Sequence, residues 1–163
     1  MTGTGLPRGL VPLPGLLGLD HVGLAVHDLD AAIAFHTAVV GLRLEHREDN
    51  VEQGVREAML VADDRASSFT QIQLLAPLSV TGSDPDTPVG RFLKRRGPGL
   101  HHLAYRVTDI ATASAVLPRH GLRLLYDAPR AGTRGSLINF IHPKDSGGVL
   151  IELVEPAADQ HSG

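Results

Sequence analysis

The segment DHVGLAV at residues 20–26 is repeated in outline as HHLAYRV at residues 101–107, and in both places an aspartate follows two residues later. The offset from His21 to His102 is 81 residues. Each segment is apolar at alternate positions, as expected for a strand with one face packed on a core. His21 and His102 each lie on the other, non-core face of their strand.

Two further pairs of segments follow at nearly the same spacing. GLRL occurs at residues 41–44 and again at 121–124, and QLLAP at 73–77 corresponds to ELVEP at 152–156. An offset that changes by only two residues over three landmarks is too regular for chance, and two copies are too few for a solenoid. The sequence therefore predicts one module used twice.

The repeat places four potential metal ligands at equivalent positions, His21 with His102 and Gln73 with Glu152. Any one of these side chains alone is more often a hydrogen-bonded structural residue than a ligand. Their pairing on the non-core strand faces favours a metal site, because a pseudo-twofold axis can bring equivalent residues to one point. Such nitrogen and oxygen ligands suit a divalent transition ion. His101 lies on the opposite face from His102, so we expect it to pack or hydrogen-bond rather than bind metal.

The pattern predicts an α+β fold of two tandem βαβββ modules, which form a curved mixed sheet around the metal site. In each module the helix begins after an aspartate cap, Asp28 or Asp109, and ends at Gly41 or Gly121. Pro118 predicts a kink or an early end in the second helix. The expected strands are residues 21–26, 43–48, 54–61, 70–75, 102–107, 123–126, 136–142 and 148–154.

A chain of 163 residues suits one compact domain, which we expect at residues 19–156. A short basic helix is expected near residues 91–96, in the segment that joins the modules. The expected boundaries are a disordered N-terminal extension rich in Gly and Pro (1–18), the first module (about 19–78), the linker (79–99), the second module (about 100–156) and a tail (157–163).

The composition excludes several classes of function. A net charge of −3 argues against a role that needs a strongly basic surface, such as binding nucleic acid or an anionic membrane. The chain has no cysteine, which excludes disulfides, thiolate metal sites and thiol catalysis. The apolar stretch at residues 9–19 contains Pro12 and Pro14 and is too short to cross a bilayer. We therefore expect a cytoplasmic protein.

Five motifs carry a resemblance to a known family. They are the segment around His21, QGVREAML at 53–60, GLHHLA at 99–104, HPKD at 142–145 and GGVLIEL at 147–153. Together they resemble the methylmalonyl-CoA epimerase family, within the glyoxalase-like vicinal oxygen chelate superfamily. The resemblance covers residues 19–156. The superfamily fold is common to many functions, but this combination of motifs is more specific.

The resemblance implies a metal-dependent isomerase that interconverts (2R)- and (2S)-methylmalonyl-CoA by removing and returning the C2 proton through a metal-stabilised enolate. It implies metal ligands at His21, Gln73, His102 and Glu152, and a catalytic glutamate at Glu57. The expected cofactor is a divalent metal ion, with Co²⁺ as first choice and Mn²⁺, Ni²⁺ or Zn²⁺ as alternatives. The resemblance also implies an acyl-CoA substrate, a homodimer, and a place in propionate metabolism or polyketide precursor supply.

This reaction needs a proton donor or acceptor on each face of C2. Glu57 is the candidate for one face, although on spacing alone a carboxylate paired with an arginine on a strand surface is the commoner case. Glu152 is the candidate for the other face. A bound water is an alternative there, because a carboxylate that binds a metal is a poor base.

Other interpretations stay open from the sequence. They are a glyoxalase-type isomerase, an iron-dependent extradiol dioxygenase, and a non-catalytic small-molecule binding protein of the same fold. Gln73 favours the epimerase, since glyoxalase I typically has a glutamate at that position. Two basic segments, residues 129–136 and 91–96, could contact coenzyme A phosphates, and a solvated charged surface is the commoner explanation.

Overall fold

The computed structural model describes residues 11–62, 70–78 and 86–158. Eight strands form one mixed sheet in the order β2-β3-β4-β1-β5-β8-β7-β6. The central pair is β1 (Leu16–Ala25) and β5 (Gly99–Val107), which run antiparallel. The remaining strands are β2 (Arg43–Asn50), β3 (Val55–Val61), β4 (Gln71–Pro77), β6 (Arg130–Ala131), β7 (Leu137–Ile141) and β8 (Leu150–Glu155).

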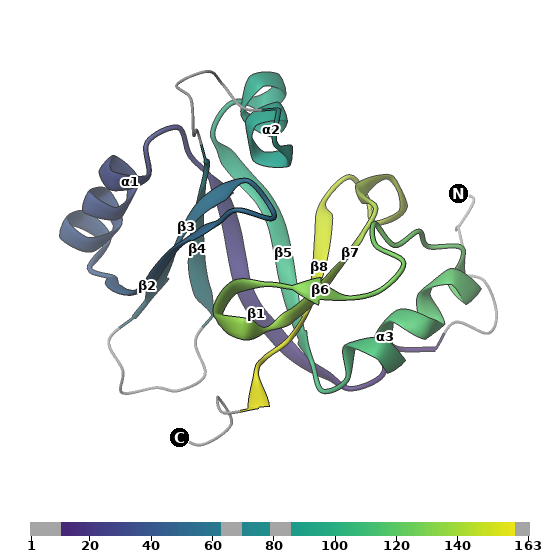
Figure 1. Ribbon diagram of the computed structural model, residues 1–163. Helices are drawn as coiled ribbons and strands as arrows, with labels where there is room; N and C mark the ends of the chain where they lie inside the picture. The colour runs from purple at the N-terminus through teal and green to yellow at the C-terminus, as the bar shows by residue number, and fades with distance from the viewer. Residues whose placement is uncertain (1–10, 63–69, 79–85, 159–163) are drawn as a thin grey trace, which may run out of the picture.

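The two halves of the sheet are built alike from the centre outward. β4 pairs in parallel with β1, and β8 pairs in parallel with β5. Each is followed toward the edge by an antiparallel neighbour, β3 on one side and β7 on the other. This arrangement, curled around its concave face in Figure 1, confirms the α+β fold of two repeated units.

The helix of each repeat begins and ends where the sequence predicts. The side chains of Asp28 and Asp109 accept hydrogen bonds of 3.0 Å from the backbone N–H groups of Ala31 and Thr112. They cap α1 (Leu29–Phe35) and α3 (Ile110–Val116). A π-helical turn, η1 (His36–Val40), continues α1, and a 3₁₀ turn, η2 (Leu117–His120), continues α3. The 3₁₀ turn holds Pro118 and accounts for the predicted kink, since proline cannot donate the α-helical hydrogen bond.

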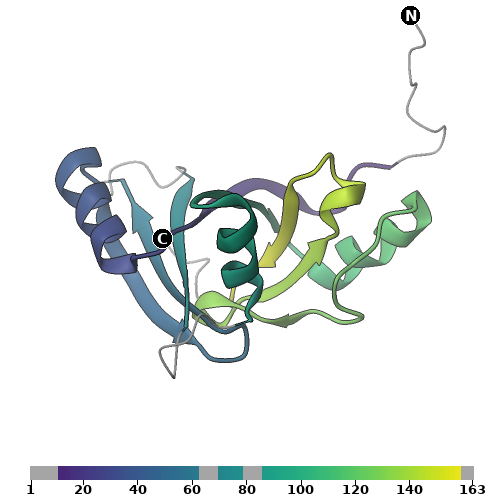
Figure 2. The ribbon, with the colours of Figure 1, turned by 90° about the horizontal axis from the view of Figure 1, so that it is seen from above.

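A third helix, α2 (Pro88–Arg96), begins at the cap Thr87 and lies over the middle of the molecule, between the outer helices α1 and α3 (Figure 2). Val89 and Leu93 on its inner face pack against Ala25 and Leu75 of the sheet. Leu24, the neighbour of Ala25, packs instead in the cluster under α1. Both faces of β1 therefore bury apolar residues, whereas the sequence indicated only one core face. No helix in the described ranges is long and apolar enough to span a membrane.

The second half departs from the expected strands near residues 123–126. Only Leu124 makes an isolated bridge there, to Ile141, and the edge strand β6 begins later. The backbone of Tyr126 instead bonds the side chain of Asn139, whose Oδ1 accepts from the Tyr126 N–H at 3.2 Å and whose Nδ2 donates to its C=O at 3.0 Å. The side-chain amide of Asn139 thus takes the place of one pair of backbone hydrogen bonds between these segments. At the other end, β1 begins at Leu16, inside the expected extension, and residues 1–10 lie outside the described ranges.

The pairing of β1 with β5 requires a residue without a side chain at one position. Gly23 faces His102 across the pair, and a Cβ added to Gly23 would lie 2.2–2.7 Å from three atoms of the His102 ring. No contact that short is tolerated, so the ring or the strand would have to move. The His102 ring can therefore occupy this position only because residue 23 has no side chain.

We expect Gly23→Ala to lower the free energy of unfolding by about 1–3 kcal/mol, the usual cost of overpacking a closely packed site. Urea denaturation measures this cost. The same substitution in a His102→Ala background should cost clearly less, because the ring that it collides with is gone. Equal costs in the two backgrounds would show that the ring is not what Gly23 accommodates.

Candidate functional site

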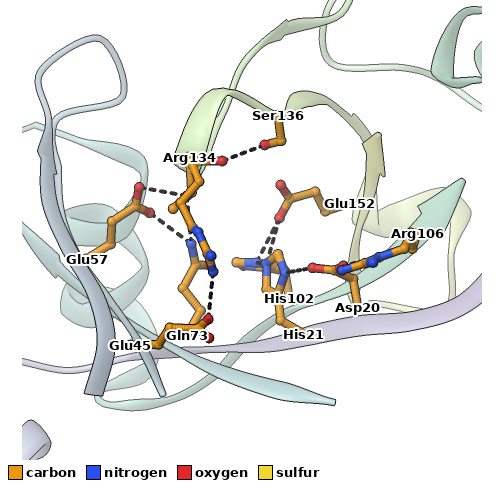
Figure 3. A network of polar contacts seen from close by, with 11 residues as sticks. Asp20, His21, Glu45, Glu57, Gln73, His102, Arg106, Arg134, Ser136 and Glu152 are labelled. Carbon is orange, nitrogen blue, oxygen red and sulfur yellow. Dashed lines mark hydrogen bonds and ion pairs between the residues drawn. The ribbon is translucent and has the colours of Figure 1, made fainter. Parts of the chain in front are cut away.

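Three buried side chains from the central strands meet on the concave face of the sheet (Figure 3). They are His21 on β1, His102 on β5 and Glu152 on β8. The two Nε2 atoms lie 3.1 Å apart, and Glu152 Oε2 lies 3.4 Å from His21 Nε2 and 2.9 Å from His102 Nε2. One ligand atom from each residue falls within 4.8 Å of the others, a spacing that can hold a metal ion.

The electrostatics of this cluster favour a cation. Burial by itself lowers the pKa of His21, but hydrogen bonds to the carboxylates of Asp20 and Glu152 outweigh it and raise the pKa above the usual range. Burial likewise raises the pKa of Glu152, and the two neighbouring imidazoles reverse this and hold it well below its usual value. Glu152 is therefore ionised at neutral pH, and a positive charge between the three residues is stabilised.

The ring of His21 is oriented by the residue before it. His21 Nδ1 donates to Asp20 Oδ2 at 2.8 Å, and Asp20 Oδ1 accepts from Arg106 Nε at 2.6 Å. The carboxylate of Asp20 thus keeps a proton on Nδ1 and turns Nε2 toward the centre, where a metal ion would replace the second ring proton. Carboxylates in this position behind a metal-binding histidine fix its tautomer and increase its basicity.

The ring of His102 is oriented by the equivalent residue of the second repeat. His101 Nδ1 lies 3.0 Å from His102 Nδ1, and one of the two must donate. Burial, and then the charge that His102 can carry, lower the pKa of His101 to about 4, so His101 is neutral and can accept. His102 then carries its proton on Nδ1 and presents Nε2 to the centre. His101 also packs on Phe92, so it hydrogen-bonds and packs, as expected.

Gln73, the fourth expected ligand, is buried on β4 beside the triad. Its Nε2 donates to Glu57 Oε2 at 2.8 Å. Its Oε1 is buried, and no donor reaches it within the described part of the chain. A buried amide oxygen without a partner is costly, and an ion at the triad would satisfy it. The residues present thus fit a divalent metal, and ligation by Gln73 remains a prediction.

Glu57 on β3 lies next to this cluster and is only 2 % exposed. Its Oε1 accepts a 2.7 Å hydrogen bond from the hydroxyl of Thr133, and Glu48 faces it across the β2–β3 pair. Burial, followed by the Glu48 carboxyl, raises the pKa of Glu57 to about 8, although the Thr133 bond acts in the opposite direction. The alternative to a catalytic role, that Glu57 is a strand-surface carboxylate paired with an arginine, is therefore wrong, because its partners are Thr133 and Gln73.

His102, Glu152 and Glu57 open onto one cavity of about 260 Å³, whereas His21 lines a smaller pocket that shares Glu152 with it. Its walls include Glu57, Gln73, His102 and Glu152, so the structure gathers these sequence-predicted residues in one space. Arg134, in the basic loop, is instead held by Glu45 at 2.6 Å, with a positive φ of 59°. Arg130 stacks over Tyr126 at 4.1 Å from the ring centre and lines the cavity.

Sequence reasoning missed three residues that support the site: Asp20, Arg106 and Thr133. Asp20 carried a signal, because the repeat aligns it with His101, directly before the other histidine. The sequence offered no signal that could have identified Arg106 or Thr133. Their partners lie 86 and 76 residues away, and neither contact has an equivalent in the other repeat.

Comparisons with known proteins agree with this geometry. The family model of the Glyoxalase/Bleomycin resistance protein/Dioxygenase superfamily matches residues 20–140. The structure of methylmalonyl-CoA epimerase from Mycobacterium tuberculosis is 47% identical, with a TM-score of 0.82 over 93% of this chain and 96% of that chain. A Streptomyces coelicolor methylmalonyl-CoA epimerase variant in complex with 2-nitronate-propionyl-CoA is 44% identical, with a TM-score of 0.79 over 88% of this chain and 99% of that one.

A curated relative gives the same result. The ethylmalonyl-CoA/methylmalonyl-CoA epimerase of Cereibacter sphaeroides is 34% identical over 137 residues, which are 83% of this chain and 95% of the relative. The similarity thus extends over nearly the whole of these relatives, and it includes solved structures above 40% identity. The chain belongs to the methylmalonyl-CoA epimerase family of the Glyoxalase/Bleomycin resistance protein/Dioxygenase superfamily.

Proposed function

We propose that this protein is a methylmalonyl-CoA epimerase, an isomerase that interconverts the 2R and 2S forms of its substrate by moving the proton on C2. The observation that carries the proposal is that a buried carboxyl with a raised pKa, Glu57, shares one cavity with His102 and Glu152, two members of a metal-type triad. Such a cavity holds both a place for developing negative charge and a group to move a proton. The family's substrate supplies the matching C–H acid.

His21, His102 and Glu152 would hold the metal, and the free oxygen of Gln73 would complete the set. A divalent ion, Co²⁺ as first choice and Mn²⁺, Ni²⁺ or Zn²⁺ as alternatives, would stabilise negative charge on the thioester oxygen as C2 loses its proton. Asp20 and His101 orient the two imidazoles toward this place. Gln73 donates to Glu57 and so ties the proton-moving carboxyl to the same centre.

Inversion at C2 needs one group that accepts the proton on one face and another that returns it on the opposite face. The environments of the two carboxyls separate their pKa values in the direction that this requires, with Glu57 raised to about 8 and Glu152 held low. Groups whose surroundings separate their pKa values in this way divide the roles of acid and base. We assign Glu57 the proton on one face and propose Glu152, or a water beside it, for the other.

The proposal extends to features that the resemblance implies. They are an acyl-CoA substrate, a homodimer, and a role in propionate metabolism or polyketide precursor supply. A cytoplasmic location is supported by the absence of cysteine. Family membership and the buried carboxyl Glu57 together favour the epimerase over the dioxygenase, the glyoxalase-type isomerase and the non-catalytic binding protein.

The decisive experiment is exchange of the C2 proton of methylmalonyl-CoA in deuterated water. We expect exchange with the purified protein, its loss after chelator treatment, and its return when Co²⁺ is added. Exchange at the rate of the uncatalysed control, with metal present, would reject the epimerase. Oxygen uptake with a catecholic substrate would establish the dioxygenase instead.

Substitutions at the triad should give a graded loss of metal binding. His102→Ala removes a proposed ligand, so tight binding should be lost. His101→Ala removes only the group that orients His102, so the affinity should fall by about 10–100-fold, as is usual for such a partner. His27→Ala, at an exposed histidine, is the control. Titration of each variant with Co²⁺ measures the order, and a His102→Ala protein that binds as tightly as the control would contradict the assignment.

Substitution of Glu57 separates its proposed role from a structural one. Glu57→Gln keeps the size of the side chain and can still accept from Thr133, but it cannot take up a proton. We expect full metal content, a cooperative melt, and a fall in C2 exchange of roughly 10²-fold or more. Glu52→Gln, in the wall of the same cavity, should exchange normally. Near-normal exchange by metal-loaded Glu57→Gln would remove this residue from the mechanism.

A further inference from the structure

One turn of the second repeat reaches across the concave face to the first repeat. It is the 3₁₀ turn η3 (Thr133–Gly135), between β6 and β7. The Thr133 hydroxyl donates to Glu57 Oε1 at 2.7 Å and accepts from Gln73 Nε2 at 3.3 Å. Because the Gln73 amide donates to this hydroxyl, the hydroxyl directs its own proton to Glu57. The turn thus holds the buried carboxyl to which we assign the C2 proton.

The next residue of the turn makes a second attachment to the first repeat. Arg134 Nη1 donates to Glu45 Oε2 at 2.6 Å, and the two side chains are 31% and 29% exposed. Figure 3 shows the Arg134 side chain extended from the turn toward Glu45. The two residues lie 89 positions apart in the chain, so this ion pair joins the two repeats.

A bulge in β2 aims Glu45 at the turn. In the β2–β3 pair, Leu44 lies opposite Leu60, and His46 lies opposite Met59. Glu45 is therefore an extra residue without a partner on β3. Neighbouring residues of β3 face opposite sides of the sheet, so the extra residue turns both Glu45 and His46 to the concave side. The Glu45 carboxylate meets Arg134 there.

Arg134 is held in a backbone conformation that an arginine does not favour. Its φ of 59° and ψ of 31° lie in the left-handed region, and it is the one non-glycine residue of the described ranges with a positive φ. A side chain makes this region costly, whereas a glycine adopts it freely. Such a conformation persists where the contacts of the residue hold it, and it occurs most often at functional sites. The ion pair with Glu45 is a contact of this kind.

We propose that Arg134 is a positioning residue: its ion pair with Glu45 holds the turn in place, so that Thr133 stays hydrogen-bonded to the Glu57 carboxyl and fixes the direction of that carboxyl. A small error in the placement of a reacting group lowers the rate strongly, so this hold contributes to the reaction without a contact to the substrate. The proposal rests on the proposed function for what Glu57 does. The hold itself rests on the contacts alone. The charge of Arg134 is then balanced by Glu45 and is not a contact for coenzyme A phosphates.

The first test measures kcat and KM for C2 exchange with methylmalonyl-CoA. Arg134→Ala should lower kcat by roughly two- to fivefold, the factor that corresponds to the loss of a partly exposed ion pair, and leave KM unchanged. Arg134→Lys keeps the charge and should retain most of the kcat. A raised KM with an unchanged kcat would show that Arg134 contacts the substrate instead, and would overturn the proposal.

The matched control is Arg47→Ala. Arg47 lies on the same strand as Glu45, and its Nη1 makes an ion pair with Asp30 Oδ1 that is also 2.6 Å long. The control therefore removes an arginine and an ion pair from β2 without releasing the turn, so kcat and KM should stay as in the wild type. A fall in kcat equal to that of Arg134→Ala would overturn the proposal.

A double-variant cycle tests whether Arg134 acts through Thr133. Thr133→Ala removes the hydroxyl that holds Glu57, so it should lower kcat by itself. Arg134→Ala added to this background should lower kcat by clearly less than in the wild type, because the turn no longer carries the group that it positions. An equal fall in the two backgrounds would show that Arg134 acts by another route.

A measurement without turnover separates this proposal from the epimerase proposal. The Gly132 N–H donates to the Ser136 C=O at 2.9 Å, and the Ser136 N–H donates to the Thr133 C=O at 3.2 Å. Exchange of these two amides with deuterated water, followed by NMR, reports the opening of the turn. Arg134→Ala should speed their exchange by roughly two- to fivefold, and Arg47→Ala should not change it.

The two measurements together assign each outcome. Faster amide exchange in Arg134→Ala, in a protein whose wild type gives no C2 exchange, would support the hold on the turn and reject the epimerase. Unchanged amide exchange in Arg134→Ala would overturn the hold, whether or not the wild type exchanges the C2 proton.

Discussion

The antiparallel pairing of β1 with β5 is the constraint on which the site depends. It sets His21 opposite Ala104 and His102 opposite Gly23, so that each imidazole lies over a small residue of the other strand. A slip of either strand by one residue would turn its histidine to the other face of the sheet and away from its partner, because side chains alternate along a strand. The distance of 3.1 Å between the two Nε2 atoms is therefore a property of the sheet register more than of the two side chains.

In each half of the site, the residue before the histidine orients the imidazole ring, but that residue is charged in the first repeat and neutral in the second. Asp20 and His101 hold equivalent positions in the repeat, and each hydrogen-bonds the Nδ1 of the histidine that follows it. Asp20 carries a charge and needs Arg106 to balance it, and the repeat equivalent of Arg106 is Ala25. Although burial lowers the pKa of His21, the charged partner Asp20 acts with Glu152 to raise it above its usual value. The repeat thus determines where the two imidazoles lie. Residues that occur in only one repeat, such as Asp20 and Arg106, determine the charge around them.

This division explains what could be predicted from the sequence. Residues that recur in both repeats could be placed: the two histidines, the partners Gln73 and Glu152, and the helix caps Asp28 and Asp109. Residues whose role depends on a contact between the repeats could not, and Thr133 reaches Glu57 over 76 positions without any periodic signal. The burial of the ligand face was also missed, because α2 lies in the segment between the repeats and has no copy to compare. The loss of regular strand pairing at Tyr126 arises from the side-chain amide of Asn139, and an alternating strand pattern does not reveal such a contact.

The burial that brings Glu57 to the site also determines what it can do. Placing a carboxyl almost out of water beside the carboxyl of Glu48 costs folding free energy, and that cost appears as a pKa near 8 in place of the usual acidic value. The hydrogen bond that Thr133 donates to Oε1 limits the rise of this pKa, and Gln73 donates to the other oxygen. The result is a group that holds or releases a proton near neutral pH, within one cavity of a carboxylate, Glu152, that stays ionised. The core under α1 and α3 packs against the opposite face of the same strands, where Ala58, Leu74 and Leu153 alternate with the site residues, and it stabilises the sheet that carries the site.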